Sequence, residues 1–390
     1  MFLKTITFAG AFALLGSTAI AGCGISSGNV SVLSNDFPAI QAVTSAAATC
    51  AGDGVTVETN LTKDHKDIMV AALTANPAQY SSVIVSNSTL VTLMNDGLVR
   101  PLDEMVTKHG AALSKSQLIT VNGKVMAVAF MANAQHLFSR TDVLEAAGVD
   151  GIPATYLDVL AAAEKIRGAG LMEYPVALNT KAGWNLAEEF VNMYMGTGAD
   201  FFKSGTAEVA VNNEYGVATL KMLKSLVAYS NPDYLTYDSN ATQAEWEAGN
   251  LALATMWGSR GSAVLDDEGS TAEVVSGTVL SAAPTWGNGA RPASTLWWDG
   301  IAISTNVSDE DAEATFVAMM NGISSDVVKA NNDAAVWLDG AYMPSPASAG
   351  VSGTAAGGAA PYPMLPFMGA LHTALGAEIT HFLQGSESAR

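Results

Sequence analysis

The sequence is poor in charged residues, and among these the bases are scarce. Lys and Arg number 18 against 37 Asp and Glu in 390 residues, which gives a formal net charge of −19. A surface this acidic disfavours nucleic acids and anionic lipids as partners. Charged residues make up 14% of the chain and apolar residues 49%, a composition that excludes a disordered protein and indicates a large core. The length favours two domains or more.

The motifs of several enzyme classes are missing. There is no His-Glu-x-x-His, no Gly-x-Ser-x-Gly and no phosphate loop ending in Gly-Lys-Ser/Thr. The five histidines are scattered, with no pair at metal-ligand spacing. We therefore predict no metal, no cofactor and no catalytic residue. A secreted glycan hydrolase stays open as an alternative, because glycosidase carboxylates have no short local signature.

Two acidic segments are expected to be ordinary solvated surface. Asp64–Asp67 (DHKD) is predicted to be the exposed start of a helix rather than a metal site. Glu188 and Glu189 follow one another in a predicted helix, where adjacent side chains do not face each other. We expect both glutamates to face solvent.

The N-terminus has the three-part layout of a secretory signal peptide. A short basic start precedes the apolar run Thr5–Leu15, and Ala19-Ile20-Ala21 is a cleavage pattern. The apolar run is shorter than the ~20 residues that span a bilayer. We predict a signal peptide over residues 1–21 and a periplasmic location. The alternative is a lipobox, because Ile-Ala-Gly precedes Cys23, and it would anchor the chain by a lipid.

The chain has two cysteines, Cys23 and Cys50. Export makes a disulfide possible. The pattern of Asn29–Ser34 is typical of a strand, and Pro38–Thr49 is predicted to be a helix that runs back antiparallel to it. This return brings Cys50 towards Cys23, so we predict a Cys23–Cys50 disulfide. A lipid-modified Cys23 with a buried free Cys50 is the alternative.

Strands alternate with helices through the first hundred residues. Asn29–Ser34, Val55–Thr59 and Ser82–Val85 are β-prone, and a helical pattern follows each of them. This alternation is typical of parallel βαβ units with both faces of the sheet covered. The predicted fold class is α/β. Near the other end, Pro344–Pro361 is rich in small residues and is expected to be a surface loop.

Five later segments, taken in order, carry a family resemblance. The first resembles a family's crossover strand between the lobes and the helix that follows it, and the second resembles a helix start of the pattern Pro-x-Thr-aromatic. The third resembles a strand with the pattern Phe-x-x-Gly-x-x-Ala-Met, with Trp246 in place of the Phe. The last two resemble the strand that returns to the first lobe and the segment that leaves that lobe again. These segments are Val121–Gly148, Ile152–Ile166, Glu245–Gly261, Ser294–Ser304 and Ala341–Ser345. The chain resembles the extracellular solute-binding proteins of family 1, the group that includes maltose-binding protein.

The resemblance implies a periplasmic-binding-protein-like, two-lobe fold of type II with a three-segment hinge that closes on a ligand. Lobe one would comprise 22–132 and 300–342, and lobe two 133–299 and 343–390. The implied function is that of the substrate-binding component of an ABC importer, which passes a sugar or small oligosaccharide to a membrane permease. A monomer that binds no nucleic acid is expected. The alternative within this fold is a binder of an anionic or other non-sugar solute.

Candidate ligand-binding residues follow from where open α/β sheets place ligands, which is at the carboxyl ends of strands. A sugar needs amide and carboxylate groups for its hydroxyls and aromatic faces for its rings. The predicted residues are Asn35, Asp36, Asn87, Asn133, Gln135, Trp184, Asn185, Trp257, Arg260, Trp297, Trp298 and Asp299.

Two of these predictions leave an alternative open. Adjacent strand residues point to opposite faces, so one of Trp297 and Trp298 is expected in the cleft and the other in the core. The sequence leaves open which is which. Arg260 would bind the carboxylate of an anionic ligand or the paired hydroxyls of a neutral sugar.

Overall fold

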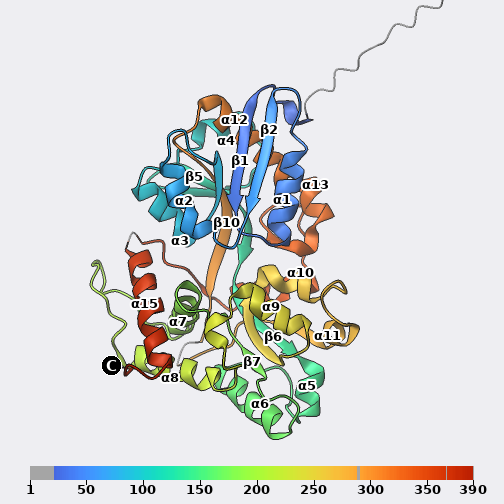
Figure 1. The fold of residues 1–390 in the computed structure, drawn as a ribbon, viewed down its shortest axis with the longest axis vertical. Coiled ribbons are helices and arrows are strands. Elements are labelled where there is room, and N and C mark those ends of the chain that lie inside the picture. The colour runs from blue at the N-terminus through green and yellow to red at the C-terminus, as the bar shows by residue number, and fades with distance from the viewer. Residues whose placement is uncertain (1–21, 288–289, 366, 390) are drawn as a thin grey trace, which may run out of the picture.

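The computed structural model describes residues 22–287, 290–365 and 367–389. The predicted signal peptide, residues 1–21, lies outside the described residues. Within them, two β-sheets form the centres of two lobes, which Figure 1 shows one above the other along the long axis. In this part of the chain, no helix has the length and apolar character needed to cross a membrane.

The larger sheet builds lobe one. Its main order is β11-β5-β10-β3-β1-β2, with β4 beside β5 and β12 beside β10. β1 is parallel to β2 and β3, whereas β10 is antiparallel to β3 and β5. The strands are β1 (Gly28–Ser34), β2 (Val55–Leu61), β3 (Ser82–Ser86), β4 (Leu118–Val121), β5 (Lys124–Asn133), β10 (Thr295–Ile303), β11 (Val336–Trp337) and β12 (Ala360–Pro361).

Helices cover both faces of this sheet, because alternate residues of its central strands point to opposite sides. Val32 packs into the cluster with α1 and α12, and the adjacent Leu33 packs with α2 and α3 on the other side. The helices of this lobe are α1 (Pro38–Ala48), α2 (His65–Thr74), α3 (Asn87–Asn95), α4 (Asp103–His109), α12 (Asp309–Gly322) and α13 (Ser325–Ala330).

The smaller sheet lies in lobe two and has the order β7-β8-β6-β9. Its strands are β6 (Gln135–Arg140), β7 (Val176–Ala177), β8 (Leu253–Trp257) and β9 (Thr278–Ser281). The helices around it are α5 (Thr141–Ala146), α6 (Tyr156–Gly168), α7 (Trp184–Gly196), α8 (Glu214–Val227), α9 (Ser239–Glu247), α10 (Gly261–Val264), α11 (Ala272–Gly277), α14 (Ala349–Ala356) and α15 (Met368–Leu383). Short 3-10 turns occur at Gly22–Gly24, Lys115–Gln117, Tyr234–Thr236, Gly258–Arg260, Asn332–Ala334 and Pro346–Ser348.

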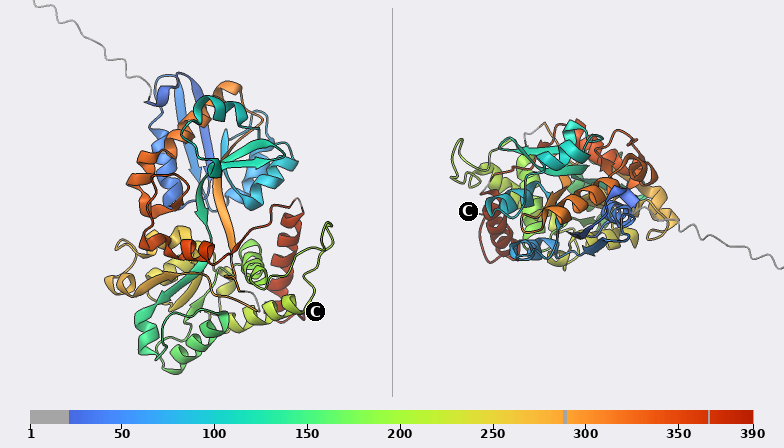
Figure 2. Two further views of the ribbon diagram at one scale, coloured as in Figure 1. Left: turned by 180° about the vertical axis from the view of Figure 1, so that it is seen from behind. Right: turned by 90° about the horizontal axis from the view of Figure 1, so that it is seen from above.

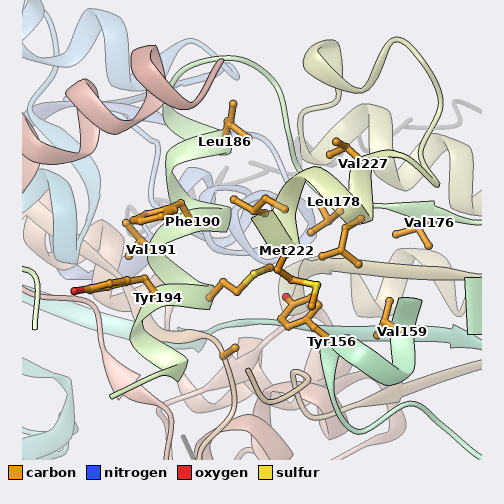
Figure 3. Close-up of a cluster of buried hydrophobic side chains, with 14 of the residues drawn as sticks. Tyr156, Val159, Val176, Leu178, Leu186, Phe190, Val191, Tyr194, Met222 and Val227 are labelled. Atoms are coloured by element: carbon orange, nitrogen blue, oxygen red, sulfur yellow. The ribbon is translucent and has the colours of Figure 1, made fainter. Parts of the chain in front are cut away.

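Helix α7 is buried along most of its length in lobe two. Figure 3 shows its side chains Leu186, Phe190 and Tyr194 in the same cluster as Met222 of α8 and Tyr156 of α6. On another side α7 packs against α15. This packing fixes the first residue of α7, Trp184, relative to the rest of the lobe.

Two strands run side by side between the lobes, as Figure 2 shows from behind. The chain leaves β5 at Asn133 and enters β6 of the other sheet at Gln135. β10 brings it back: Trp297 pairs with Asn133, and residues 299–303 pair with β3. A third passage follows β11 and leads to α14 in lobe two.

A disulfide joins Cys23 and Cys50, whose Cα atoms are 5.3 Å apart. Cys50 follows α1, and this helix returns the chain to the start of β1. The predicted disulfide is therefore confirmed. It forms for the predicted reason, because the helix runs antiparallel to the strand and brings Cys50 back to Cys23.

Residues 344–361 are not a surface loop, which corrects the prediction. They contain a 3-10 turn, the helix α14 and the strand β12, and α14 packs on β6 and β9. A Cβ atom at Gly350 would lie 2.1 Å from Nδ1 of His136. Small residues are needed here because the helix approaches the sheet closely.

Candidate ligand-binding cleft

A cavity of about 350 Å³ lies between the lobes. Lobe one contributes the segments that follow β1 and β2 and the end of β3, so the carboxyl ends of three parallel strands meet there. Lobe two contributes the start of α7, the start of α9 and the end of β8. Eight of the predicted residues line the cavity: Asn35, Asn133, Trp184, Asn185, Trp257, Arg260, Trp297 and Asp299.

Three tryptophans form one wall of the cavity, and we call Trp184, Trp257 and Trp297 the tryptophan wall. The ring centroids of Trp184 and Trp257 are 6.5 Å apart with planes inclined by 25°. Trp297 meets both edge-on, at 5.8 Å from Trp184 and 5.5 Å from Trp257. These separations lie within the range in which aromatic rings attract one another. The wall offers indole surface to the apolar face of a ligand.

Trp297 and Trp298 point to opposite sides of β10, as predicted. Trp297 lines the cavity and packs into the lobe two cluster. Trp298 packs instead against the lobe one cluster that contains Leu33 and Met69. The cleft residue of the pair is therefore Trp297, and it is also a core residue, with 5% of its surface exposed.

Lys66 is the principal cleft residue that the sequence analysis missed. Its Nζ lies 3.4 Å from the ring centroid of Trp184, so a lobe one cation covers a lobe two indole. Burial lowers the pKa of Lys66 to about 8, and the charges of Asp299 and Glu188 oppose this shift. Burial raises the pKa of Asp299 to about 7, against the effect of Lys66.

A signal for Lys66 was present in the sequence. The segment 63–67 follows β2 as Asn35 follows β1, and all five of its residues line the cavity. Asp64–Asp67 does contain the start of a helix, but His65 is buried and Lys66 faces the cleft. The strand-end rule, applied to the second strand as well, selects this segment.

The residues that line the cavity carry equal numbers of positive and negative formal charges. Four bases, Lys63, Lys66, Lys181 and Arg260, occur with four acids, Asp64, Asp67, Asp238 and Asp299. Lys181 pairs with Asp238 at 3.4 Å. The cleft is thus locally neutral in a chain whose formal charge is −19.

Arg260 is buried at the lobe two side of the cavity. Its Nη1 donates to Oε1 of Gln243 at 3.3 Å, whereas its Nε has no hydrogen-bond partner. Burial lowers the pKa of Arg260, and the charges of Asp238, Asp36 and Glu247 oppose that shift. The Nε–H group is thus both buried and without a partner.

Four predicted residues are not among the lining residues. Asp36 is exposed and accepts from Nε2 of Gln41 at 2.8 Å. Asn87 is buried and accepts from the backbone N–H of Trp298 at 3.0 Å, which ties α3 to β10. Gln135 is buried beside α7, and Trp298 lies in the lobe one cluster described above.

Glu188 and Glu189 are both buried, which corrects the prediction that they face solvent. Their exposed fractions are 0% and 1%. Oε1 of Glu188 contacts Thr295 and Trp297, whereas Glu189 accepts from the backbone N–H of Asn179 at 3.0 Å. Burial raises the pKa of each to about 8. The prediction failed because α7 is enclosed on several sides, so adjacent positions of the helix are both inside.

Metal binding has no support among the residues described. In 22–287, 290–365 and 367–389 no group of three His, Cys, Asp or Glu side chains is arranged to hold a metal ion.

Two sheet-centred lobes, strands that pass between them and a polar, aromatic cleft are typical of two-lobe solute-binding proteins. A family model described as "Bacterial extracellular solute-binding protein" matches residues 33–323, and the chain belongs to this family. The two-lobe α/β fold and the family predicted from the sequence are both confirmed.

Individual proteins are also similar to this chain in sequence or in fold. A curated relative from Deinococcus radiodurans, described as "Probable ABC transporter-binding protein", is 26% identical over 208 residues, 52% of this chain. The match covers 49% of that relative, so the chain spans about half its length.

Two solved structures share the fold. One is an ABC transporter solute-binding protein from Agrobacterium radiobacter K84 in complex with ribitol, with a TM-score of 0.80, 19% identity, and coverage of 94% of this chain and 96% of that one. The other is maltose-bound MalE3 of T. maritima, with a TM-score of 0.80, 17% identity, and coverage of 93% and 96%.

Proposed function

We propose that this protein is the substrate-binding component of an ABC importer and that it binds a sugar or small oligosaccharide in the cleft. The tryptophan wall is the observation that carries the proposal. Indole faces stack on the apolar faces of sugar rings, and the amide and carboxylate groups around them pair with hydroxyls. The balanced charge of the lining favours a neutral ligand. Two proteins of the same fold hold ribitol and maltose.

Hinge bending would close the lobes on the ligand. The proposed lobes are 22–132 with 300–342, and 133–299 with 343–390. Asn133 and Asp299 lie at these proposed boundaries and line the cavity, so a ligand that contacts them is held where the lobes meet.

The cellular setting is part of the proposal. Residues 1–21 serve as a signal peptide, and the mature protein is a periplasmic monomer that delivers its ligand to a membrane permease. It binds no nucleic acid and catalyses no reaction. A lipid anchor at Cys23 is disfavoured, because the sulfur of Cys23 is bonded to Cys50.

A second candidate is an anionic solute, and one observation favours it. Arg260 is buried at the cavity and its Nε is unpaired. A ligand carboxylate would accept from this guanidinium in a charge-assisted hydrogen bond.

A thermal-shift screen over sugars, sugar alcohols, organic acids and amino acids tests the proposal. A ligand at a hundred times its Kd stabilises a protein by ~2.7 kcal/mol, which raises the melting temperature of a chain of this size by several degrees. We expect sugars to give the shift. Shifts with organic acids alone would favour the second candidate, and steady release of reducing ends from oligosaccharides would make the protein a hydrolase.

A further inference from the structure

Glu188 lies directly behind the tryptophan wall. Its Oε1 is 3.1 Å from Nε1 of Trp297 and 2.8 Å from Oγ1 of Thr295, and its Oε2 has no hydrogen-bond partner. Thr295 and Trp297 are two residues apart on β10, so both point to the same face of the strand. Glu188 does not line the cavity, but Trp297 does. The carboxyl group of Glu188 can therefore affect the cavity through the position of the Trp297 indole.

The hydrogen bonds around Thr295 show where a proton must be. A hydroxyl has one proton to donate and two lone pairs to accept with. Oδ1 of Asn192 accepts the backbone N–H of Thr295 at 2.8 Å, which identifies this atom as the amide oxygen. The same Oδ1 is 2.6 Å from Oγ1 of Thr295, so the hydroxyl proton of Thr295 is donated to Asn192.

The remaining two contacts of the Thr295 hydroxyl require donors. The indole N–H of Trp297, 2.7 Å away, is one of them. Oε1 of Glu188, 2.8 Å away, must be the other, and only a protonated carboxyl group can donate. An ionised Glu188 would set two oxygens against each other, with no proton left to place between them.

We propose that Glu188 is a positioning residue of the ligand site: as a neutral carboxylic acid it donates to Thr295 and holds the Trp297 indole in the wall, and loss of its proton weakens ligand binding at alkaline pH. This inference rests on the proposed function and adds the group that sets the position of Trp297. Burial raises the pKa of Glu188 to about 8, although its contacts with Thr295 and Trp297 act to lower that pKa. The raised pKa agrees with a protonated group at neutral pH.

Two charged neighbours act on Glu188. Lys66, from α2 of lobe one, lowers the pKa of Glu188, and Glu189, from the same helix, raises it. The negative charge of Asp299, a carboxylate of the cavity, in turn raises the pKa of Lys66. Both neighbours titrate in the alkaline range, so the test must separate Glu188 from them.

His372 of α15 faces the other oxygen, with its Nδ1 4.0 Å from Oε2. The Trp184 carbonyl can only accept, so Nε2–H of His372 donates to it at 2.9 Å. Nδ1 then accepts from the hydroxyl of Tyr362 at 2.9 Å. Burial lowers the pKa of His372 to about 4. His372 is therefore neutral and gives no proton to Glu188.

The test compares the wild type with Glu188→Gln and the matched control Glu189→Gln, without ligand, from about pH 6 to about pH 10. The near-ultraviolet circular dichroism of the indoles reports the setting of Trp297. We expect a wild-type transition near pH 8, close to the pKa of Glu188. The carboxamide of Glu188→Gln donates to Thr295 without titrating, so its transition shrinks to the part contributed by Lys66, which lies over Trp184 and has a pKa of about 8. Glu189→Gln keeps the transition, because Glu189 contacts Asn179 and Thr255 instead.

Two further measurements complete the test. The infrared difference between wild type and Glu188→Gln at about pH 6 should show the carbonyl band of a protonated carboxylic acid. With maltose and ribitol as probes, calorimetry should show the Kd of the wild type rising about tenfold more than that of Glu188→Gln by pH 10, since Lys66 and Asp299 titrate in both proteins.

The inference is overturned if the wild-type dichroism is flat over this pH range, if Glu188→Gln shows the wild-type transition, or if the infrared difference lacks the acid band. The first result needs no variant, so it holds even if Glu188→Gln does not fold. Failure of both probes to bind at neutral pH counts against the proposed function, whereas the measurements without ligand still decide the role of Glu188.

Discussion

The two walls of the cleft are built differently. Lobe one presents short polar segments at strand ends, among them Asn35 and Lys66. Lobe two presents the tryptophan wall, which is held from behind by Glu188, Thr295 and His372 through hydrogen bonds and ring contacts. A rigid aromatic face costs little ordering when a ligand binds, whereas long polar side chains must be ordered at that moment. Under the proposed function, lobe two would supply a preorganised aromatic face and lobe one hydrogen-bonding groups that are ordered when the ligand binds.

The difference is sharpest where the walls touch. Lys66 extends from lobe one to cover Trp184 of lobe two. A ligand ring that stacks on this face of Trp184 must displace the ammonium group, whereas a ligand on Trp297 or Trp257 leaves it in place. Substitutions on each wall can therefore test how the two lobes share the work of binding.

The largest effect is expected from Trp297→Ala, on the lobe two wall. The change removes a buried indole, so it should lower the free energy of unfolding by ~3–5 kcal/mol, and it should abolish binding of the ligand found in the screen. Urea unfolding and titration calorimetry measure the two effects. Trp298→Ala is the matched control, and we expect it to keep ligand affinity. If Trp298→Ala loses affinity and Trp297→Ala does not, then Trp298 and not Trp297 is the residue of the pair that contacts the ligand.

Loss of the disulfide should weaken lobe one and leave the wall of lobe two intact. The bridge spans a sequence separation of 27 residues, for which chain entropy predicts a loss of about 3–4 kcal/mol. Denaturant unfolding of Cys23→Ser and of the reduced wild type should give the same shift. The near-ultraviolet spectrum of the indoles should stay unchanged in the folded state. A spectrum that collapses in Cys23→Ser would mean that the walls are coupled.

Asp299→Ala removes the carboxylate where β10 crosses from one lobe to the other. We expect ligand binding to weaken at least about tenfold, equivalent to ~1.4 kcal/mol, because a carboxylate that accepts from hydroxyls contributes more than a neutral acceptor. Calorimetry with the ligand from the screen measures the change. Asp96→Ala, an exposed lobe one acid outside the lining set, is the control. Equal affinities in the two variants would place the site elsewhere in the cleft.

Lys66→Met should have the smallest effect on stability, within about 1 kcal/mol in the protein without ligand, since the lost cation–π contact is offset by removal of a charge that burial disfavours. The change should raise the pKa of Asp299 above its value of about 7, because the charge of Lys66 lowers that pKa. Carboxyl carbon resonances followed over pH measure the shift. Lys63→Met also removes a lining base, but not this contact. A pKa of Asp299 that falls in Lys66→Met would contradict the pairing.

The strand-end rule finds the lobe one side of the cleft, but the residues selected with it were only partly right: Asn35 lines the cavity, whereas Asp36 and Asn87 do not. Each strand end there is local: a short apolar run stops, and polar residues follow it, as at Asn35 and Ser86. The same rule covers Lys66, which was missed only because the segment was interpreted as a solvated helix start. The opposite orientations of Trp297 and Trp298 likewise follow from the strand period of two.

On the lobe two side the lining residues could be predicted, since seven of the eight correct predictions belong to it, but their surroundings could not, because these come from distant parts of the chain. The sequence of α7 shows apolar residues at helical spacing, but it does not show that α15 and β10 enclose the face that carries Glu188. The composition of 344–361 also does not distinguish a surface loop from a helix that packs closely on the sheet, as this one does where Gly350 approaches His136. Burial of a charge depends on such long-range neighbours.

The sequence by itself determined the α/β alternation, the family, the return of Cys50 to Cys23 and eight residues of the cavity lining, because these depend on local periodicity, strand ends and segment order. Only the tertiary structure decided that Trp297 faces the cleft, that Lys66 reaches Trp184 across it and that Glu188 is enclosed. The physical reason is that a side chain's exposure and its hydrogen-bond partners are set by elements far away in sequence. For Glu188 these partners are Thr295 and Trp297, more than a hundred residues further along the chain.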